Sequence, residues 1–257
     1  MKSHVVKTAA SLVTFLGACA TPLVSVAQTY QIEANAEMGI RSFDFDRGGS
    51  GDGNIINLGA RYYLAPVETV GPWAESAFLQ KSTSAGIALF RTGDNFDSNT
   101  DFAIDLFLVT ADNLILGGQL GSNDATNIGA FGGLYLDDRT TAIASISLGD
   151  IDSIGGEYKT IMQLASGNDL TAEANIALVN AGDSGIAIGG SATYYLSDQL
   201  GVSGGLGLET FGNEEISLEV GAKYFLSETL AVGGDLSLAF GDFLDTTSIT
   251  IGAIGRF

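Results

Sequence analysis

The chain has 257 residues with 30 acidic and 11 basic side chains, yet 46% of its residues are hydrophobic and its mean hydropathy is +0.27. Its formal net charge of −19 excludes a nucleic-acid-binding protein, because a chain this acidic is repelled by phosphate backbones. Its apolar content equally excludes a disordered acidic chain.

The first 27 residues have the parts of a secretory signal peptide. Lys2 and Lys7 form a positive segment, residues 9–18 are apolar, and residues 25–27 (Ser-Val-Ala) are suited to a cleavage site. We expect cleavage after Ala27, which leaves residues 28–257 as one domain. A second interpretation takes Cys19 as a lipoprotein cleavage site, but the small residues 25–27 would then have no role.

Cleavage after Ala27 removes the single Cys and the single His of the chain. The mature chain then lacks the commonest general base, the thiol nucleophile and most transition-metal ligands, so we expect no enzymatic activity, no metal site and no cofactor. Nine basic and 30 acidic residues remain, which gives a charge of −21. No later run of about 18 apolar residues could form a transmembrane helix.

Apolar and polar residues alternate with period two through residues 200–209, 216–224 and 230–240, which is typical of β-strands. One face is aliphatic, and the other is small, polar or charged. In a soluble β-sandwich the aliphatic face would be the core, whereas in a membrane barrel it would contact lipid. The 35 glycines fall largely on the polar face, which favours a barrel wall.

A short motif of two bulky residues and a Leu recurs along the chain, each time before turn-forming residues. Its copies end at Leu64, Leu108, Leu136, Leu164, Leu196 and Leu226, with spacings of 44, 28, 28, 32 and 30 residues. Phe257 follows after 31 more. A period near 30 is that of a hairpin of two strands and two connections, as expected for a repeated supersecondary unit.

These hairpins predict an all-β antiparallel transmembrane barrel of about 14 strands. The expected strands are 29–45, 54–64, 73–91, 100–111, 114–121, 127–136, 140–149, 154–165, 169–180, 185–196, 199–210, 215–226, 229–240 and 247–257. An even number is usual for single-chain bacterial barrels. An even number of strands also places the repeated motifs and both termini at the same rim of the barrel. We assign this rim to the periplasmic side.

Aromatic residues are expected to form a girdle at each rim, where amphipathic rings meet lipid headgroups. The predicted periplasmic group is Tyr62, Tyr63, Trp73, Tyr135, Tyr194, Tyr195, Tyr224 and Phe257. The predicted outer group is Phe43, Phe45, Phe90, Phe211 and Phe240. Phe257, the last residue of an alternating strand, resembles the C-terminal signal read by the outer-membrane assembly machinery, which we expect as a partner.

Two adjacent segments carry a resemblance to a known family. Tyr62-Tyr63-Leu64-Ala65-Pro66 and Gly71-Pro72-Trp73-Ala74-Glu75-Ser76-Ala77-Phe78-Leu79 are similar to segments of the putative general bacterial porin family of gammaproteobacteria. The clear match covers about twenty residues, and the remainder is similar only in its strand rhythm. The resemblance implies a Gram-negative outer-membrane barrel and, more loosely, a diffusion pore for small solutes.

Alternation places a set of charged residues inside the barrel, where they would line a pore. They are Glu33, Glu37, Arg41, Arg61, Glu75, Lys81, Asp101, Asp105, Glu157, Lys159, Glu173, Glu209, Glu219, Lys223, Asp235 and Arg256. Acids outnumber bases, so a weak cation preference is expected. Fourteen strands give a backbone diameter of roughly 28 Å and a lumen of roughly 10–15 Å. The alternative is a set of cross-strand ion pairs that plugs a narrow barrel. No segment is long enough to form a folded plug.

Acidic residues also gather in the connections expected at the outer rim. These residues are Asp44, Asp46, Asp52, Asp94, Asp97, Asp101, Asp242 and Asp245. They could bridge to lipopolysaccharide through divalent cations, or simply be solvated loop residues. Two further alternatives stay open at this point: a non-conducting structural or adhesive barrel, and a soluble secreted β-sandwich.

Overall fold

The computed structural model describes residues 29–45, 49–94, 98–122, 126–149, 151–180, 184–210, 214–242 and 244–257. Within these ranges, 14 antiparallel strands close into one barrel, in which every strand pairs with its neighbours in the chain and the first pairs with the last. The predicted fold is therefore confirmed. The expected signal peptide, with Cys19 and Ala27, lies outside the described residues, as does Phe211.

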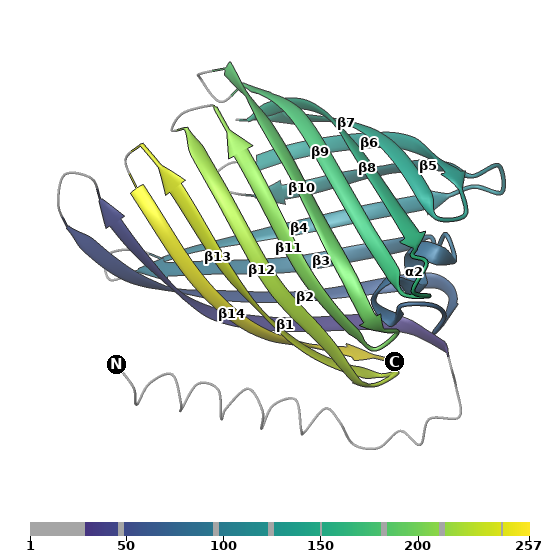
Figure 1. Ribbon diagram of the computed structural model, residues 1–257. Helices are drawn as coiled ribbons and strands as arrows, with labels where there is room; N and C mark the ends of the chain where they lie inside the picture. Colours follow the sequence, from purple (N-terminus) through teal and green to yellow (C-terminus); the bar gives the residue numbers. More distant parts are fainter. Residues whose placement is uncertain are drawn as a thin grey trace.

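The bounds of the elements match most of the expected strands. They are β1 (Thr29–Phe45), β2 (Ser50–Glu68), η1 (Trp73–Glu75), α2 (Ser76–Leu79), β3 (Ser84–Asp94), β4 (Ser98–Val109), β5 (Leu114–Ser122), β6 (Thr126–Asp137), β7 (Thr140–Gly149), β8 (Asp152–Gln163), β9 (Asp169–Asn180), β10 (Ser184–Ser197), β11 (Leu200–Glu209), β12 (Glu215–Ser227), β13 (Leu230–Gly241) and β14 (Leu244–Arg256). Figure 1 shows the slanted strands and places α2 at the rim that also holds the C-terminus. We call this rim the terminal rim.

The barrel closes by a long antiparallel ladder between β1 and β14. Pairing runs from Glu33 opposite Arg256 to Phe45 opposite Leu244. Phe257 extends the closure, because its backbone N–H donates to the carbonyl of Ile32 at 2.8 Å and its carbonyl accepts from the N–H of Ile32 at 2.9 Å. The last residue of the chain therefore completes the hydrogen bonding at the seam.

The aliphatic face of each strand lies on the outside of the barrel. Leu206, Ile128 and Ile154 are 64%, 62% and 59% exposed, although they belong to well-ordered strands with paired backbones. A soluble β-sandwich buries such side chains between two sheets, whereas a membrane barrel presents them to lipid. This distribution removes the soluble β-sandwich as an alternative.

The repeated aromatic motif marks a β-bulge at the terminal rim. The strand register shifts directly after Tyr135, Tyr195 and Phe225. Each shift lies just before a tight turn. The aromatic residue before the bulge is buried at 2–5% exposure, while the following Leu is 54–56% exposed. The aromatic ring therefore points inward and the Leu towards lipid, as alternation along the strand requires, and the bulge lies between the ring and the turn.

The predicted periplasmic girdle is consequently only partly correct. Tyr62 and Tyr224 face outward and are 50% and 43% exposed, as a lipid-facing girdle requires. Tyr63, Tyr135 and Tyr195 are buried inside the barrel instead. Alternation along the strand separates these cases, because each buried ring directly precedes an outward-facing Leu, and the expected girdle grouped rings of both faces together.

One predicted strand is wrong. Residues 73–83 do not form the first half of a strand, and β3 begins only at Ser84. Gly71 adopts a left-handed backbone with φ of 58°, and Pro72 follows it, so the chain turns away from the sheet before Trp73. Ser76 then accepts a hydrogen bond from the N–H of Gln80, which closes one turn of helix.

Inward-facing glycines let neighbouring side chains lie flat against the wall. At Gly117, the ring of Phe131 crosses the backbone and packs against Phe107, with ring centroids 5.9 Å apart. Any Cβ at this position would collide with the Phe131 ring and with the backbone oxygen of Leu106. Glycine at such positions therefore keeps side chains out of the lumen.

Substitution of Gly117 by Ala is expected to destabilise the barrel by about 1–3 kcal/mol, the usual cost of overpacking. Thermal unfolding, followed by the loss of fast migration on an unheated gel, measures the change. Gly132→Ala is the matched control, since a Cβ there would meet nothing closer than 3.8 Å. Equal melting temperatures for the two variants would contradict this role of Gly117.

Candidate functional site

The inner face of the barrel is the candidate site, and most residues predicted to line it occupy inward positions of strands. By alternation with the exposed aliphatic residues, these are Glu33, Glu37 and Arg41 (β1), Arg61 (β2), Asp101 and Asp105 (β4), Glu157 and Lys159 (β8), Glu173 (β9), Glu209 (β11), Glu219 and Lys223 (β12), Asp235 (β13) and Arg256 (β14). Between them lie mainly Gly, Ala, Ser, Thr and Asn. The wall thus combines many small side chains with a few charged ones.

Glu75 and Lys81 are the exceptions, because neither lies on a strand. Both belong to residues 69–83, the connection between β2 and β3, which we call the inward segment. It folds back into the terminal rim and contacts side chains of the inner wall across the barrel. The strand pattern of the sequence did not predict this inward segment.

Glu75 is the buried centre of these contacts and is 7% exposed. Its carboxylate accepts hydrogen bonds from the Tyr195 hydroxyl at 2.9 Å and the Thr171 hydroxyl at 3.1 Å. It also forms an ion pair with Lys159 Nζ at 2.9 Å, and Lys159 in turn contacts Glu173 at 2.8 Å. Removing such a buried partner is costly, so the contact holds the segment firmly against β8–β10.

Aromatic rings of the repeated motif also pack against the inward segment. The Trp73 ring packs edge-on against the ring of Phe225, with centroids 5.8 Å apart. The backbone N–H of Trp73 donates to the carbonyl of Asp198 at 2.8 Å. On the other side, Phe78 lies 5.4 Å from the ring of Tyr135, whose hydroxyl donates to the Phe78 carbonyl at 3.1 Å. The inward bulge residues therefore form the surface on which the segment rests.

Both ends of the inward segment are also fixed. Gly71 and Lys81 adopt left-handed backbone conformations, with φ of 58° and 53°. Lys81 Nζ contacts Asp138 at 2.7 Å, and this hydrogen-bonded charge holds the pKa of the Asp138 carboxyl below its usual value. Asp138 is almost fully exposed, so this contact contributes little compared with the buried one at Glu75.

The inward segment leaves a crevice at one side of the rim. A cavity of about 290 Å³ lies between Ala74 and Glu75 on the segment and strands β10–β13 of the wall. Lys223, Asp235 and Glu219 line this cavity. The terminal rim is thus narrowed by the segment, and the remaining space is bordered by charged side chains.

Ion pairs that reach over an intervening strand neutralise much of the charge in the half of the lumen near the terminal rim. Arg61 makes two hydrogen bonds of 2.9 Å to Asp105, and Arg139 contacts Asp169 at 2.7 Å. Arg139 and Asp169 were not predicted, because one lies in a turn and the other at the start of a strand. Their only signal in the sequence was their placement beside the repeated motif.

Acidic residues remain in excess on the opposite part of the wall. Glu37, Glu219 and Asp235 lie close enough to act on one another electrostatically. Glu157 and Glu173 border a second cavity of about 360 Å³ together with Glu219. Strands β8, β9, β12, β13 and β1 therefore present a negatively charged surface to the lumen.

Arg256 joins the seam of the barrel to the aromatic residues beneath it. It is 3% exposed, pairs with Glu33 at 2.8 Å, and lies between the rings of Tyr30 and Phe225 at 4.4 and 4.5 Å. It stacks on two rings and pairs with a carboxylate, which suits a planar guanidinium.

Arg256→Met is expected to lower the free energy of unfolding by about 3 kcal/mol, because it leaves the Glu33 carboxylate without its partner. Thermal melting of the refolded barrel measures this change. The double variant Arg256→Met and Glu33→Gln is the control, because neither charge is then left without a partner, and it should cost less than Arg256→Met alone. A melting temperature of Arg256→Met equal to that of the unmodified protein would contradict the role of this pair.

Among the described residues, no group of three or more His, Cys, Asp or Glu side chains is placed to hold a metal ion. No helix in that part of the chain is long and apolar enough to span a membrane.

Comparison with known proteins decides the family. The family model described as "Putative general bacterial porin" matches residues 13–150, more than half of the chain. The chain belongs to the putative general bacterial porin family. This porin is therefore a porin-like channel protein of the bacterial outer membrane.

Solved structures agree on the fold of this porin. The outer membrane protein Omp33 of Acinetobacter baumannii is 18% identical, with a TM-score of 0.71 over 90% of this chain and 99% of that one. A bacterial polysaccharide outer membrane secretin follows at 11% identity and a TM-score of 0.51, over 87% and 98% of the two chains. The β-domain of the Bordetella autotransporter Brka has 11% identity and a TM-score of 0.50, over 88% and 100%. No curated protein matches.

Proposed function

We propose that this porin is a channel for the passive diffusion of small hydrophilic solutes, with a weak preference for cations. The observation that carries the proposal is the inner wall, which is polar, rich in small residues and negatively charged around Glu37, Glu219 and Asp235. A pore lined with carboxylates raises the local concentration of cations and lowers that of anions. The charged residues predicted from the sequence to face inward, from Glu33 to Arg256, are proposed to line this pore.

The inward segment sets the narrowest part of the proposed path. Solutes would pass the terminal rim through the crevice between Ala74 and the wall strands β10–β13. With both termini placed on the periplasmic side, this constriction lies at the periplasmic mouth. The channel is then narrow at one end and wide over the rest of its length.

Planar-bilayer recording of the purified full-length barrel tests this function. In a KCl gradient, we expect discrete conductance steps and a reversal potential of the sign that indicates K⁺ preference. A protein that is shown to be folded by its fast migration on an unheated gel, yet gives no steps above background, would overturn the channel. Steps with Cl⁻ preference would overturn the proposed selectivity.

A second candidate is a non-conducting structural or adhesive barrel. One observation favours it, namely that the inward segment is held by a buried ion pair and two hydrogen bonds at Glu75. If the unmodified protein stays silent while a variant without the segment conducts, the non-conducting barrel is the better description.

Two partners are proposed on chemical grounds. Asp44, Asp52 and Asp245 lie at the rim opposite the termini, on strand ends rather than in the expected loops, and could bridge through divalent cations to lipopolysaccharide. Phe257, half-exposed at the seam, would be read by the assembly machinery after export and cleavage at Ala27.

A further inference from the structure

Arg41 is an inward-facing cation that has no acidic partner among the described residues. Each of the other inward or rim cations in ion pairs lies 2.7–2.9 Å from a carboxylate: Arg61, Lys81, Arg139, Lys159 and Arg256. The Arg41 side chain instead packs over the backbone of Gly53. A Cβ added to Gly53 would lie 3.1 Å from Arg41 Nε. The stem is fixed against the wall, and its Nε is buried without a hydrogen-bond partner in the described part of the chain.

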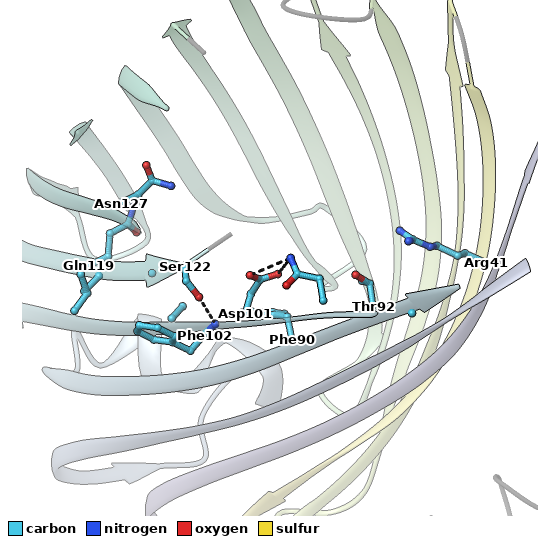
Figure 2. Close-up of a pocket in the computed structure, with 13 residues that line it drawn as sticks. Arg41, Phe90, Thr92, Asp101, Phe102, Gln119, Ser122 and Asn127 are labelled. Carbon is cyan, nitrogen blue, oxygen red and sulfur yellow. Dashed lines mark hydrogen bonds between the residues drawn. The ribbon is translucent and has the colours of Figure 1, made fainter. Parts of the chain in front are cut away.

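Arg41 borders a cavity on the inner wall. This cavity has a volume of about 740 Å³ and draws its lining from β1 and from β3 to β6. Figure 2 shows Arg41 at one side of it, with Thr92 and Asp101 in the middle and Gln119 and Asn127 at the other side. Its volume lies in the range of pockets that take small organic molecules. It lies away from the inward segment and shares none of its residues.

Phe90 gives this cavity an apolar surface. It occupies an inward position of β3, opposite Asn57 and Asp101, and yet it is 40% exposed. Other inward rings of the barrel are covered: Phe43 is 8% exposed, and Phe107 packs against Phe131. An aromatic ring left open in a polar lumen can cover the apolar part of a bound solute.

Asp101 adds a carboxylate next to Phe90. It accepts a hydrogen bond from the amide of Asn99 at 3.2 Å, which orients it on the wall. The cavity thus has a cation at one side, an aromatic ring and a carboxylate in the middle, and amide groups of Gln119 and Asn127 beyond. A simple organic anion is repelled by the acidic lumen, whereas a solute with no net charge is not.

We propose that this cavity is a recognition site for small zwitterions that carry an apolar group, such as amino acids with apolar side chains. Arg41 would bind the carboxylate by a charge-assisted, bidentate contact. Phe90 would cover the apolar group, and Asp101 would face the ammonium. As a step in solute passage, the site rests on the proposed channel function, because the solute reaches it through the lumen.

Equilibrium binding of L-phenylalanine to the detergent-solubilised full-length barrel, measured by calorimetry, tests the site. We expect saturable binding of phenylalanine that is tighter than that of 3-phenylpropionate, which lacks the ammonium, or phenethylamine, which lacks the carboxylate. Arg41→Ala and Phe90→Ala should each weaken binding about tenfold, as expected for the loss of a charged hydrogen bond or of an apolar contact. Arg91→Ala and Phe240→Ala are matched controls at exposed outward positions and should bind as the unmodified protein does.

Two outcomes would overturn the site: no saturable binding of phenylalanine, or binding that Arg41→Ala leaves unchanged. Because binding is measured without ion flow, it separates the two proposals. A barrel that conducts but does not bind phenylalanine refutes the recognition site alone. A barrel that binds phenylalanine through Arg41 but never conducts refutes the channel alone.

Discussion

Glu75→Ala is expected to raise the single-channel conductance about threefold or more, because the narrowest section of a pore limits ion flow. The substitution removes the ion pair with Lys159 and the hydrogen bonds from Thr171 and Tyr195. Without them, the inward segment loses its buried anchor on β8–β10 and leaves the rim. The measurement is the step size in planar bilayers, with fast gel migration as the test of folding.

Asp138→Asn is the matched control for this experiment. It removes the other ion pair of the segment, which lies between Lys81 and an almost fully exposed carboxylate. Exposed pairs contribute little, so its conductance should stay close to that of the unmodified protein. A second variant, in which residues 69–82 are replaced by a short Gly-Asn turn, removes the segment altogether and should conduct most. Equal conductance in Glu75→Ala, the turn variant and the unmodified protein would show that the segment does not limit the pore.

Neutralising the centre of the acidic wall is expected to weaken the cation preference. In the triple variant Glu37→Gln, Glu219→Gln and Asp235→Asn, the three carboxylates that act on one another are lost while the side-chain volumes are retained. Ion-paired groups such as Arg61 and Asp105 stay as they are, and Glu157 and Glu173 keep part of the negative wall. The reversal potential in a KCl gradient should therefore move towards zero.

The control for the wall charges lies on the outer surface. Asp44 and Asp245 face each other across β1 and β14 and are exposed on the outer face. The double variant Asp44→Asn and Asp245→Asn removes two negative charges, where the triple variant removes three, but it leaves the lumen unaltered. If it shifts the reversal potential as far as the triple variant does, net charge rather than the lumen wall sets the selectivity.

The strand pattern was predictable because a barrel wall imposes period two on nearly every residue. The repeated motif correctly marked one rim, since every copy after the first precedes a tight turn, whereas the copy at Leu64 leads to the inward segment. Alternation also gives the inward facing of Tyr195 and Phe225, because the Leu after each faces outward. The motif did not reveal the β-bulge between these rings and the turn, because its register depends on the partner strand.

The place of the inward segment in the barrel could not be predicted from local pattern. Residues 73–79 (Trp-Ala-Glu-Ser-Ala-Phe-Leu) do not alternate with period two, which argues against a strand but does not show where they pack. What decides their fold is a set of partners far along the chain, 96 residues away at Thr171 and 120 residues away at Tyr195. A buried Glu is stable only with such partners, and they become visible only once the barrel is closed.

Swelling of proteoliposomes in solutions of neutral sugars tests passive diffusion most directly. With the unmodified barrel, we predict swelling that is fastest for the smallest sugars, slows as the sugar grows, and accelerates in Glu75→Ala. Liposomes that contain folded barrel and swell no faster than protein-free liposomes, for every sugar and for both proteins, would contradict a diffusion channel.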